Sequence, residues 1–356
     1  GYNFELLNNH NARKLNDGIA YSLPSEYEFE VAAKLLSSIN FGESVRFARN
    51  GSDVTSAAIR LARYITKKDT VICNGYHGWQ DWYIGSTTRS GGVPDSIKSL
   101  THKINGFDTQ MLEDRFKSIG HQIACLIVEP MIGDEPNIEF LKLARDLCNK
   151  YGSLLIFDEC WTGFRCNKEG AIGYTGIKPD LVCYAKAIGN GVPVAAIVGP
   201  KKFMKHFEEI FFSFTHASDP IGLAAADFMI DYLDHKFYID LTSKTKQLFD
   251  GIKLRLTKIN NPLYQINVTS YPGKIVLSPV ENELSMHIKT FIQKEFLNKK
   301  MLFNMFFAMC EDHLDDDIDL ALDVIENIVQ KLEVTDFDLI NDVKDQLVSP
   351  VFRSQK

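Results

Sequence analysis

The chain has 356 residues, of which 45% are hydrophobic and 24% charged, so it can fill the core of more than one domain. Its 39 Lys and Arg against 46 Asp and Glu give a net charge of −7 without basic clusters, which argues against nucleic-acid binding. It has no charged leader before an apolar stretch and no apolar run of about 18 residues, so we expect no membrane span. Its seven cysteines are scattered without zinc spacing, so we expect no metal site and a cytoplasmic location.

The first 40 residues are expected to form an arm and one helix. Residues 2–22 show little periodicity and are rich in Asn, which favours a loop with at most a short strand. A helix is predicted to begin at Ser25, with Glu28 completing a capping box, and to end before Gly42.

A strand, a tight turn and a helix follow. Residues 44–49 indicate the strand, and Asn50, Gly51 and Ser52 form the turn before an apolar-faced helix. A helix N-terminus offers unpaired N–H groups, and Gly51 allows close approach, so the turn can hold a phosphate. The alternative is that Ser52 or Asp53 simply caps the helix.

Aromatic side chains follow the next apolar run, residues 70–73. Tyr76 is placed to lie against a planar cofactor and His77 to form a hydrogen bond nearby. Packing of these rings on the core is the alternative interpretation.

Two further buried strands alternate with a helix. Residues 123–128 end at Glu129, and a helix over 138–151 precedes the run 154–157, which ends at Asp158. This βαβ pattern predicts an α/β fold with a mostly parallel sheet covered by helices. Ligand-binding side chains collect at the carboxyl ends of such strands, where we place Asn50, Tyr76, Glu129, Asp158 and Lys186.

Lys186 follows a fourth apolar run, residues 181–184. We expect this lysine to be buried, which would lower its pKa and leave a free amine able to attack carbonyls. Pyridoxal phosphate chemistry needs such an amine together with a carboxylate beside the pyridine nitrogen, which Asp158 would supply. For each residue alone, a capping aspartate or an exposed loop lysine is the alternative.

The remaining sequence indicates a returning strand at 195–199, with Thr215 further on as a candidate phosphate ligand. A helix near 233–256 leads into a smaller α/β domain with strands near 264–268, 274–277 and 301–307 and helices near 283–297 and 315–332. The expected domains are an N-terminal arm and helix (1–40), a large cofactor-binding domain (41–230) and a small C-terminal domain (231–356).

Several blocks of the chain resemble class III, fold type I pyridoxal-phosphate aminotransferases, most of all their glutamate-1-semialdehyde 2,1-aminomutase branch. The blocks are Arg46–Asp53, Tyr76-His77-Gly78, Val128-Glu129-Pro130, Phe157-Asp158-Glu159, Thr162-Gly163-Phe164-Arg165, Pro179-Asp180-Leu181, Ala185-Lys186, and Thr215 ahead of Asp219-Pro220. The likeness runs from about residue 24 to residue 332, and it is specific for the cofactor site rather than for a substrate.

The resemblance implies that Lys186 forms a Schiff base with pyridoxal 5′-phosphate and later carries the proton. Asp158 would pair with the pyridine nitrogen, and Tyr76 would stack on one ring face with Cys160 near the other.

The resemblance also implies a phosphate site shared between two chains. Asn50, Gly51 and Ser52 would hold the phosphate, joined by Thr215 from a second subunit, which implies a homodimer. Further residues expected to line the pocket are His77, Glu129 and Trp161.

The expected activity is that of an aminotransferase that moves an amino group between an amino donor and a small aldehyde, ketone or keto-sugar. The alternatives are an aminomutase that transfers the group within one molecule, and a catalytically silent dimeric homologue.

Overall fold

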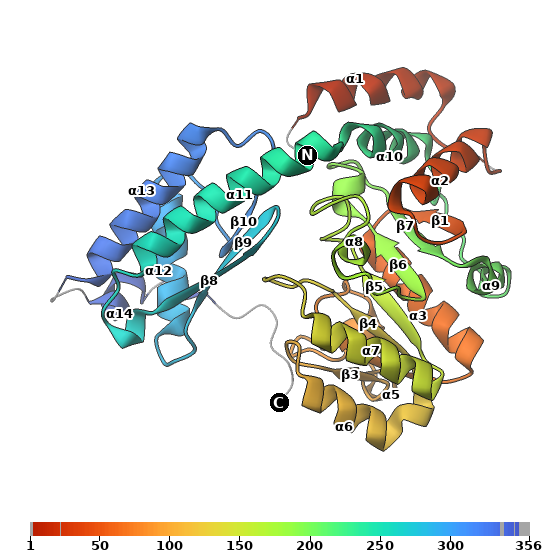
Figure 1. Ribbon diagram of the computed structural model, residues 1–356, viewed down its shortest axis with the longest axis horizontal. Helices are drawn as coiled ribbons and strands as arrows, with labels where there is room; N and C mark the ends of the chain where they lie inside the picture. Colours follow the sequence, from red (N-terminus) through yellow and green to blue (C-terminus); the bar gives the residue numbers. More distant parts are fainter. Residues whose placement is uncertain (1–2, 22, 335–337, 345, 349–356) are drawn as a thin grey trace. The chain divides into compact units, whose positions relative to one another are not determined.

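The computed structural model describes residues 3–21, 23–334, 338–344 and 346–348, which form two units (Figure 1). The large unit contains residues 3–132 and 136–234, and the small unit contains residues 133–135 and the described residues from 235 to 348. The boundaries at residues 40 and 230, drawn from the sequence, stay predictions.

The large unit is built on a seven-stranded sheet in the order β1-β7-β6-β5-β4-β2-β3. In that order the strands are Ser44–Ala48, Ala195–Gly199, Leu181–Tyr184, Leu154–Asp158, Ile123–Val128, Thr70–Asn74 and Thr101–Lys103. Strand β7 is antiparallel to both of its neighbours, β1 and β6, while β2 to β6 pair in parallel. The predicted α/β fold with a mostly parallel sheet is confirmed. Strand β3, with three residues, is too short for its period to show in the sequence.

Strands β2, β4 and β5 are buried along their whole length, as expected for strands covered on both faces. Helix α3 (Gly51–Thr66) packs Val54 and Leu61 against strand residues such as Ile127 and Ile156. The α-helices that follow α3 in this unit are α4 (Asp81–Ile84), α5 (Asp95–Lys98), α6 (Thr109–Ile119), α7 (Ile138–Tyr151), α8 (Ala171–Thr175), α9 (Lys201–Met204) and α10 (Pro220–Tyr232).

The N-terminal segment differs from its prediction, because residues 5–14 form helix α1 (Glu5–Lys14) rather than a loop. Only Leu7 and Asn11 of this helix are buried, so it lacks the apolar stripe that reveals a helix in sequence. It is held instead by tertiary packing, in which the Phe4 ring meets Phe228 and Tyr232 of α10 edge-on.

Helix α2 (Glu26–Ile39) begins after Ser25 and ends before Gly42, as predicted. The predicted capping box is wrong, because the Ser25 side chain makes no capping hydrogen bond.

The small unit contains an antiparallel sheet in the order β10-β9-β8, formed by Phe306–Ala308, Lys274–Pro279 and Ile266–Tyr271. Its helices are α11 (His235–Leu256), α12 (Ser285–Asn298), α13 (Asp315–Leu332) and α14 (Leu339–Val343). Ile252, Phe291 and Ile325 are central to its core. Among the described residues of the whole chain, no helix is both long and apolar enough to cross a membrane.

Candidate functional site

The candidate site lies at the carboxyl edge of the large sheet. Because β7 is antiparallel to both β1 and β6, strand β1 runs in the same direction as β2, β4, β5 and β6. The turns that follow these five strands therefore leave the sheet at one edge. Glu129 directly follows β4, Asp158 ends β5, and Lys186 follows β6 by two residues.

The site contains a buried hydrogen-bonded pair, His77 and Asp158. His77 Nδ1 lies 2.8 Å from Asp158 Oδ2, and Nε2 lies 3.1 Å from the carbonyl oxygen of Asn74. Both ring nitrogens of His77 therefore have an oxygen partner inside the protein, and one of these partners is the Asp158 carboxylate. Burial raises the pKa of Asp158, but the hydrogen bond and charge of His77 outweigh it, and the net pKa lies below its usual value. Asp158 is therefore a carboxylate at neutral pH.

Lys186 is exposed, so the prediction of a buried lysine is wrong. The strand before it, β6, is buried along its whole length, but the burial ends at Ala185. The Lys186 backbone has φ +53°, a left-handed conformation that costs about 1–3 kcal/mol for a non-glycine residue and is typical of functional sites. Burial dominates the pKa of Glu129, which is raised, and the positive charge of Lys186 opposes that effect; the same charge adds to the lowering of the Asp158 pKa by His77.

The turn before helix α3 is capped by Asn50. Its side chain accepts a hydrogen bond from Asp53 N, and the Asp53 carboxylate accepts one from Asn50 N, both at 3.2 Å. The alternative of Ser52 or Asp53 as the N-cap is therefore wrong. The first-turn N–H groups of Gly51 and Ser52 have no acceptor within the helix, which is the arrangement that binds anions.

The same turn packs against two other parts of the site. A Cβ atom at Gly51 would lie 3.0 Å from Cys160 Sγ, next to the end of β5. A Cβ atom at Gly78, where φ is +106°, would lie 2.2 Å from Ser52 Oγ, next to the loop after β2. Glycine at both positions lets the turn, β5 and the β2 loop approach one another closely.

Tyr76 and Glu129 lie side by side at the ends of β2 and β4. The Glu129 carboxylate accepts a hydrogen bond from Tyr76 N at 2.8 Å. Burial, joined by the charge of Asp158, raises the pKa of Glu129. The Tyr76 ring contacts Tyr83 edge-on, and the residue as a whole is 43% exposed, which suits contact with a planar ligand.

Trp161 lines the site beside Lys186, whose Nζ lies 5.3 Å from the centroid of the indole ring. Arg165, to which the sequence alone assigns no role, has its Cζ 4.9 Å from the same centroid and donates from Nε to the carbonyl oxygen of Trp161 at 3.2 Å. The only sequence signal for Arg165 is its place in the block Thr162–Arg165, which carries no indication of what the guanidinium contacts.

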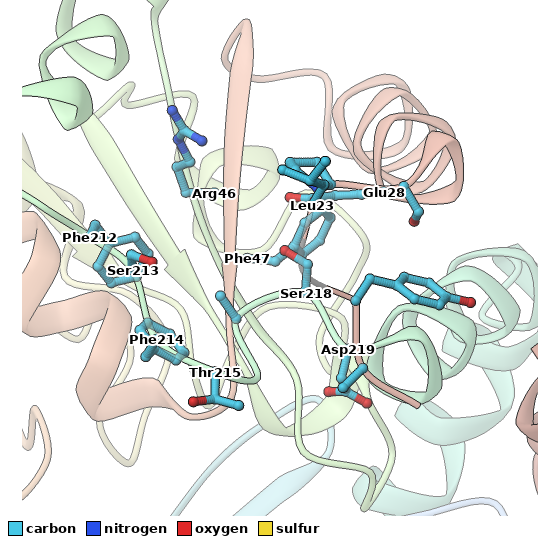
Figure 2. Close-up of a pocket in the computed structure, with 15 residues that line it drawn as sticks. Leu23, Glu28, Arg46, Phe47, Phe212, Ser213, Phe214, Thr215, Ser218 and Asp219 are labelled. Atoms are coloured by element: carbon cyan, nitrogen blue, oxygen red, sulfur yellow. The ribbon is translucent and has the colours of Figure 1, made fainter. Parts of the chain in front are cut away.

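Thr215 lines a cavity whose lining includes none of the other predicted site residues. It is exposed, and this cavity of about 210 Å³ is formed by the N-terminal segment, β1 and the loop before α10. Figure 2 shows Thr215 and Ser218 on that loop, with Leu23 and Glu28 from the N-terminal segment and Arg46 from β1. Beside this cavity, Arg49 forms an ion pair with Asp219, whose other carboxylate oxygen caps α10.

The groups at the sheet edge suit one kind of ligand. A helix N-terminus suits a phosphate, a buried carboxylate suits a protonated ring nitrogen, and the Lys186 amine suits a carbonyl carbon. In the described part of the chain, no group of His, Cys, Asp and Glu is arranged to hold a metal ion.

Comparison with known proteins agrees with this chemistry. Residues 1–297 match the family model described as aminotransferase class-III. The chain is 34% identical over 271 residues to glutamate-1-semialdehyde 2,1-aminomutase of Methanococcus maripaludis, a match that covers 71% of this chain and 64% of that relative. It is 31% identical over 347 residues to the enzyme of the same name from Aquifex aeolicus, covering 88% of this chain and 81% of that relative. The structure resembles an omega-transaminase from Sphaerobacter thermophilus with a TM-score of 0.85 at 20% identity, over 94% of this chain and 84% of the other.

Proposed function

Because the chain belongs to the class-III aminotransferase family of pyridoxal-phosphate enzymes, we propose that it transfers an amino group from a small amino donor to a small aldehyde, ketone or keto-sugar. The observation that carries this proposal is the meeting of the His77–Asp158 pair and Lys186 at one sheet edge.

Different side chains at this edge would bind different parts of pyridoxal 5′-phosphate. Asp158 would accept a hydrogen bond from the ring nitrogen, and the N–H groups of Gly51 and Ser52, next to the Asn50 cap, would receive the phosphate. Tyr76, which is partly exposed, would offer its ring to one face of the cofactor ring. Cys160, buried against Gly51, and His77, Glu129 and Trp161 complete the walls. When bound, the cofactor supplies an electron-withdrawing ring that stabilises negative charge on the donor carbon.

Lys186 is the proposed proton carrier. Its amine would hold the cofactor at the carbonyl carbon, and the same amine, when free, would be the group that takes a proton from the donor carbon and gives it back at a neighbouring carbon. An exposed and flexible side chain can make this movement, and the Trp161 ring beside Nζ limits its direction.

We further propose that the active assembly is a cytoplasmic homodimer in which Thr215 of one chain completes the phosphate site of the other. Thr215 is exposed and lies in a cavity separate from its own Lys186. The same part of the surface exposes large apolar side chains, with Leu23 79% and Phe211 82% exposed, which favours burial against a second chain. All seven cysteines are free thiols, as suits a reducing compartment.

An aminomutase activity is the second candidate, and the 34% and 31% identical relatives favour it. It differs in needing no separate amino donor. A silent homologue is disfavoured, because Lys186, Asp158 and Tyr76 are all present at the sheet edge.

The test is the absorption spectrum of the purified chain with pyridoxal phosphate, recorded before and after addition of L-glutamate without an acceptor. We expect a visible band that glutamate converts to the pyridoxamine spectrum. The aminomutase would be supported instead if glutamate leaves the band unchanged but the protein converts glutamate-1-semialdehyde. Absence of any band would contradict both.

Lys186→Ala is the matched variant for this experiment. It should bind pyridoxal phosphate through the unchanged phosphate turn and Asp158, but lose about 10²–10⁴-fold in turnover because it has no proton carrier. Turnover equal to that of the wild type would contradict the assignment of Lys186.

A further inference from the structure

Glu159 is a fully buried carboxylate that the proposed chemistry does not use. It follows Asp158 directly, and successive side chains of an extended chain point to opposite sides. The contacts agree with this rule, since Asp158 meets His77 whereas the Glu159 side chain meets Thr162 and Ala171. Glu159 therefore cannot act on a ligand held by Asp158, and its burial needs another explanation.

The Glu159 carboxylate holds both ends of one loop. Oε2 accepts a hydrogen bond from the Thr162 hydroxyl, near the start of the loop, and Oε1 accepts one from Ala171 N at 2.7 Å, where α8 begins. The residue itself is fixed to the sheet, because Glu159 N donates to the carbonyl oxygen of Cys183 at 2.9 Å. One side chain thus connects the sheet to both ends of residues 160–171.

The Glu159 carboxylate is packed closely against the backbone of Gly170. Gly170, at φ +61°, lies so close that an added Cβ atom would be 2.5–2.7 Å from the carboxylate atoms. Glycine is required there on both counts, because of its backbone conformation and because of the neighbouring carboxylate.

The loop that Glu159 holds carries the wall beside Lys186. Trp161 and Arg165 both belong to it, and the Trp161 ring lies 5.3 Å from Lys186 Nζ. A loop free at both ends would let the indole leave this position, whereas a loop fixed at Thr162 and Ala171 keeps it beside the amine.

We propose that Glu159 is a positioning residue. Its hydrogen bonds hold the loop 160–171 and thereby keep Trp161 beside the Lys186 amine. This inference rests on the proposed function, in which Lys186 moves the proton. Its distinguishing requirement is a hydrogen bond to Thr162 and another to Ala171 rather than a negative charge.

Three variants separate these requirements. Glu159→Ala removes both hydrogen bonds. Glu159→Gln keeps an acceptor for Ala171 N and offers an amide N–H to the Thr162 oxygen, so it restores both bonds without the charge. Thr162→Val removes a single bond with almost no change of shape, and it remains informative if Glu159→Ala does not fold.

The first measurement is amide hydrogen exchange of peptides covering residues 160–171 in the full chain without added cofactor. We expect exchange at least about tenfold faster in Glu159→Ala and a smaller increase in Thr162→Val, with Glu159→Gln within about twofold of the wild type. Unchanged exchange in both Glu159→Ala and Thr162→Val would overturn the proposal, as would equal loss of protection in Glu159→Gln and Glu159→Ala.

The second measurement is steady-state turnover and pyridoxal phosphate affinity of the loaded variants. We expect kcat of Glu159→Ala to fall about tenfold or more, with cofactor affinity within about threefold and Glu159→Gln close to the wild type. A loosened loop with unchanged kcat would overturn the positioning role. A wild type that forms no absorption band would contradict the proposed function alone, because the exchange measurement needs neither cofactor nor turnover.

Discussion

His77 controls the charge of Asp158 through a contact that is closed to solvent. Its side chain is 0% exposed and that of Asp158 is 3% exposed, so water cannot replace the hydrogen bond if it is lost. A buried carboxylate without this partner would have a raised pKa, and its protonated form would no longer supply the negative charge that pairs with a protonated pyridine nitrogen.

His77→Phe should therefore reduce both stability and turnover. The ring volume is kept but Asp158 loses its partner, so we expect a loss of about 3 kcal/mol in unfolding free energy at pH 7 and a large fall in kcat. Since the folded pKa of Asp158 is below its unfolded value of 3.8, the pair's contribution is present above that pH and is lost as pH falls through the folded pKa. Denaturant unfolding at pH 7 measures the effect, and equal stability of the two proteins would contradict it.

The pKa of Glu159 is shifted in the opposite direction, so its contribution to stability depends on pH in the opposite sense. Burial raises its pKa from 4.5 to about 7, with the charge of Asp158 adding to the effect and the bonds from Thr162 and Ala171 opposing it. The carboxyl group is protonated in the folded state at pH values where the unfolded chain is already ionised. Its contribution to stability is thus fully present below about pH 4.5 and is lost as pH rises to about 7.

Glu159→Gln, which cannot ionise, should not lose this contribution. We expect the variant to gain stability relative to the wild type as pH rises from about 4.5 to about 7, by an amount on the order of 3 kcal/mol. Denaturant unfolding of both proteins across that range measures the difference. A difference in stability that does not change with pH would contradict the raised pKa.

At the scale of elements, the site depends on how closely the turn before α3 meets the loop after β2. Gly78→Ala should place a Cβ atom against Ser52 and also strain the backbone, with an expected loss of about 2–4 kcal/mol and weaker pyridoxal phosphate binding. Gly92→Ala is the matched control. It has a similar φ of +83° with no atom within 4 Å, so it should show the backbone strain alone and normal cofactor binding. Equal effects of the two variants would contradict the role of close packing.

The same scale explains what the sequence can predict. Apolar runs such as residues 123–128 and 154–157 are recognisable as strands because both faces are buried, and parallel strands bring their last residues to one edge. That is why Glu129, Asp158 and Lys186 can be grouped from the order of the residues alone. Helix α1 cannot be recognised in this way, because it is held by rings of α10 more than 200 residues away in sequence.

Contacts made by irregular loops also cannot be predicted from the sequence. Burial of Lys186 is the natural inference from the strand before it, but exposure depends on what covers the turn. The links from Glu159 to Ala171 and from Arg165 to Trp161 follow from loop geometry, which has no period to detect.

At the scale of the whole molecule, a site shared between two chains makes a testable prediction. Lys186→Ala and Thr215→Asp should each be inactive alone, the second because an added carboxylate repels the phosphate. If chains exchange freely after mixing in equal amounts, half of the dimers are mixed and each mixed dimer has one intact site. We expect about a quarter of wild-type activity. Activity that stays at the level of the separate variants would contradict a shared site.

The antiparallel strand β7 also has a consequence for the order in which the protein can form during synthesis. Strand β1 joins the sheet through β7, with Ser44 paired to Gly199, so the ribosome must extend the chain well past β1 before this edge can close. A nascent chain that ends before residue 195 can pair β4, β5 and β6 but has no partner strand for β1, which leads into the phosphate turn. Ribosome-bound chains of increasing length should therefore acquire affinity for pyridoxal phosphate only after β7 has left the exit tunnel, although Lys186 has emerged earlier.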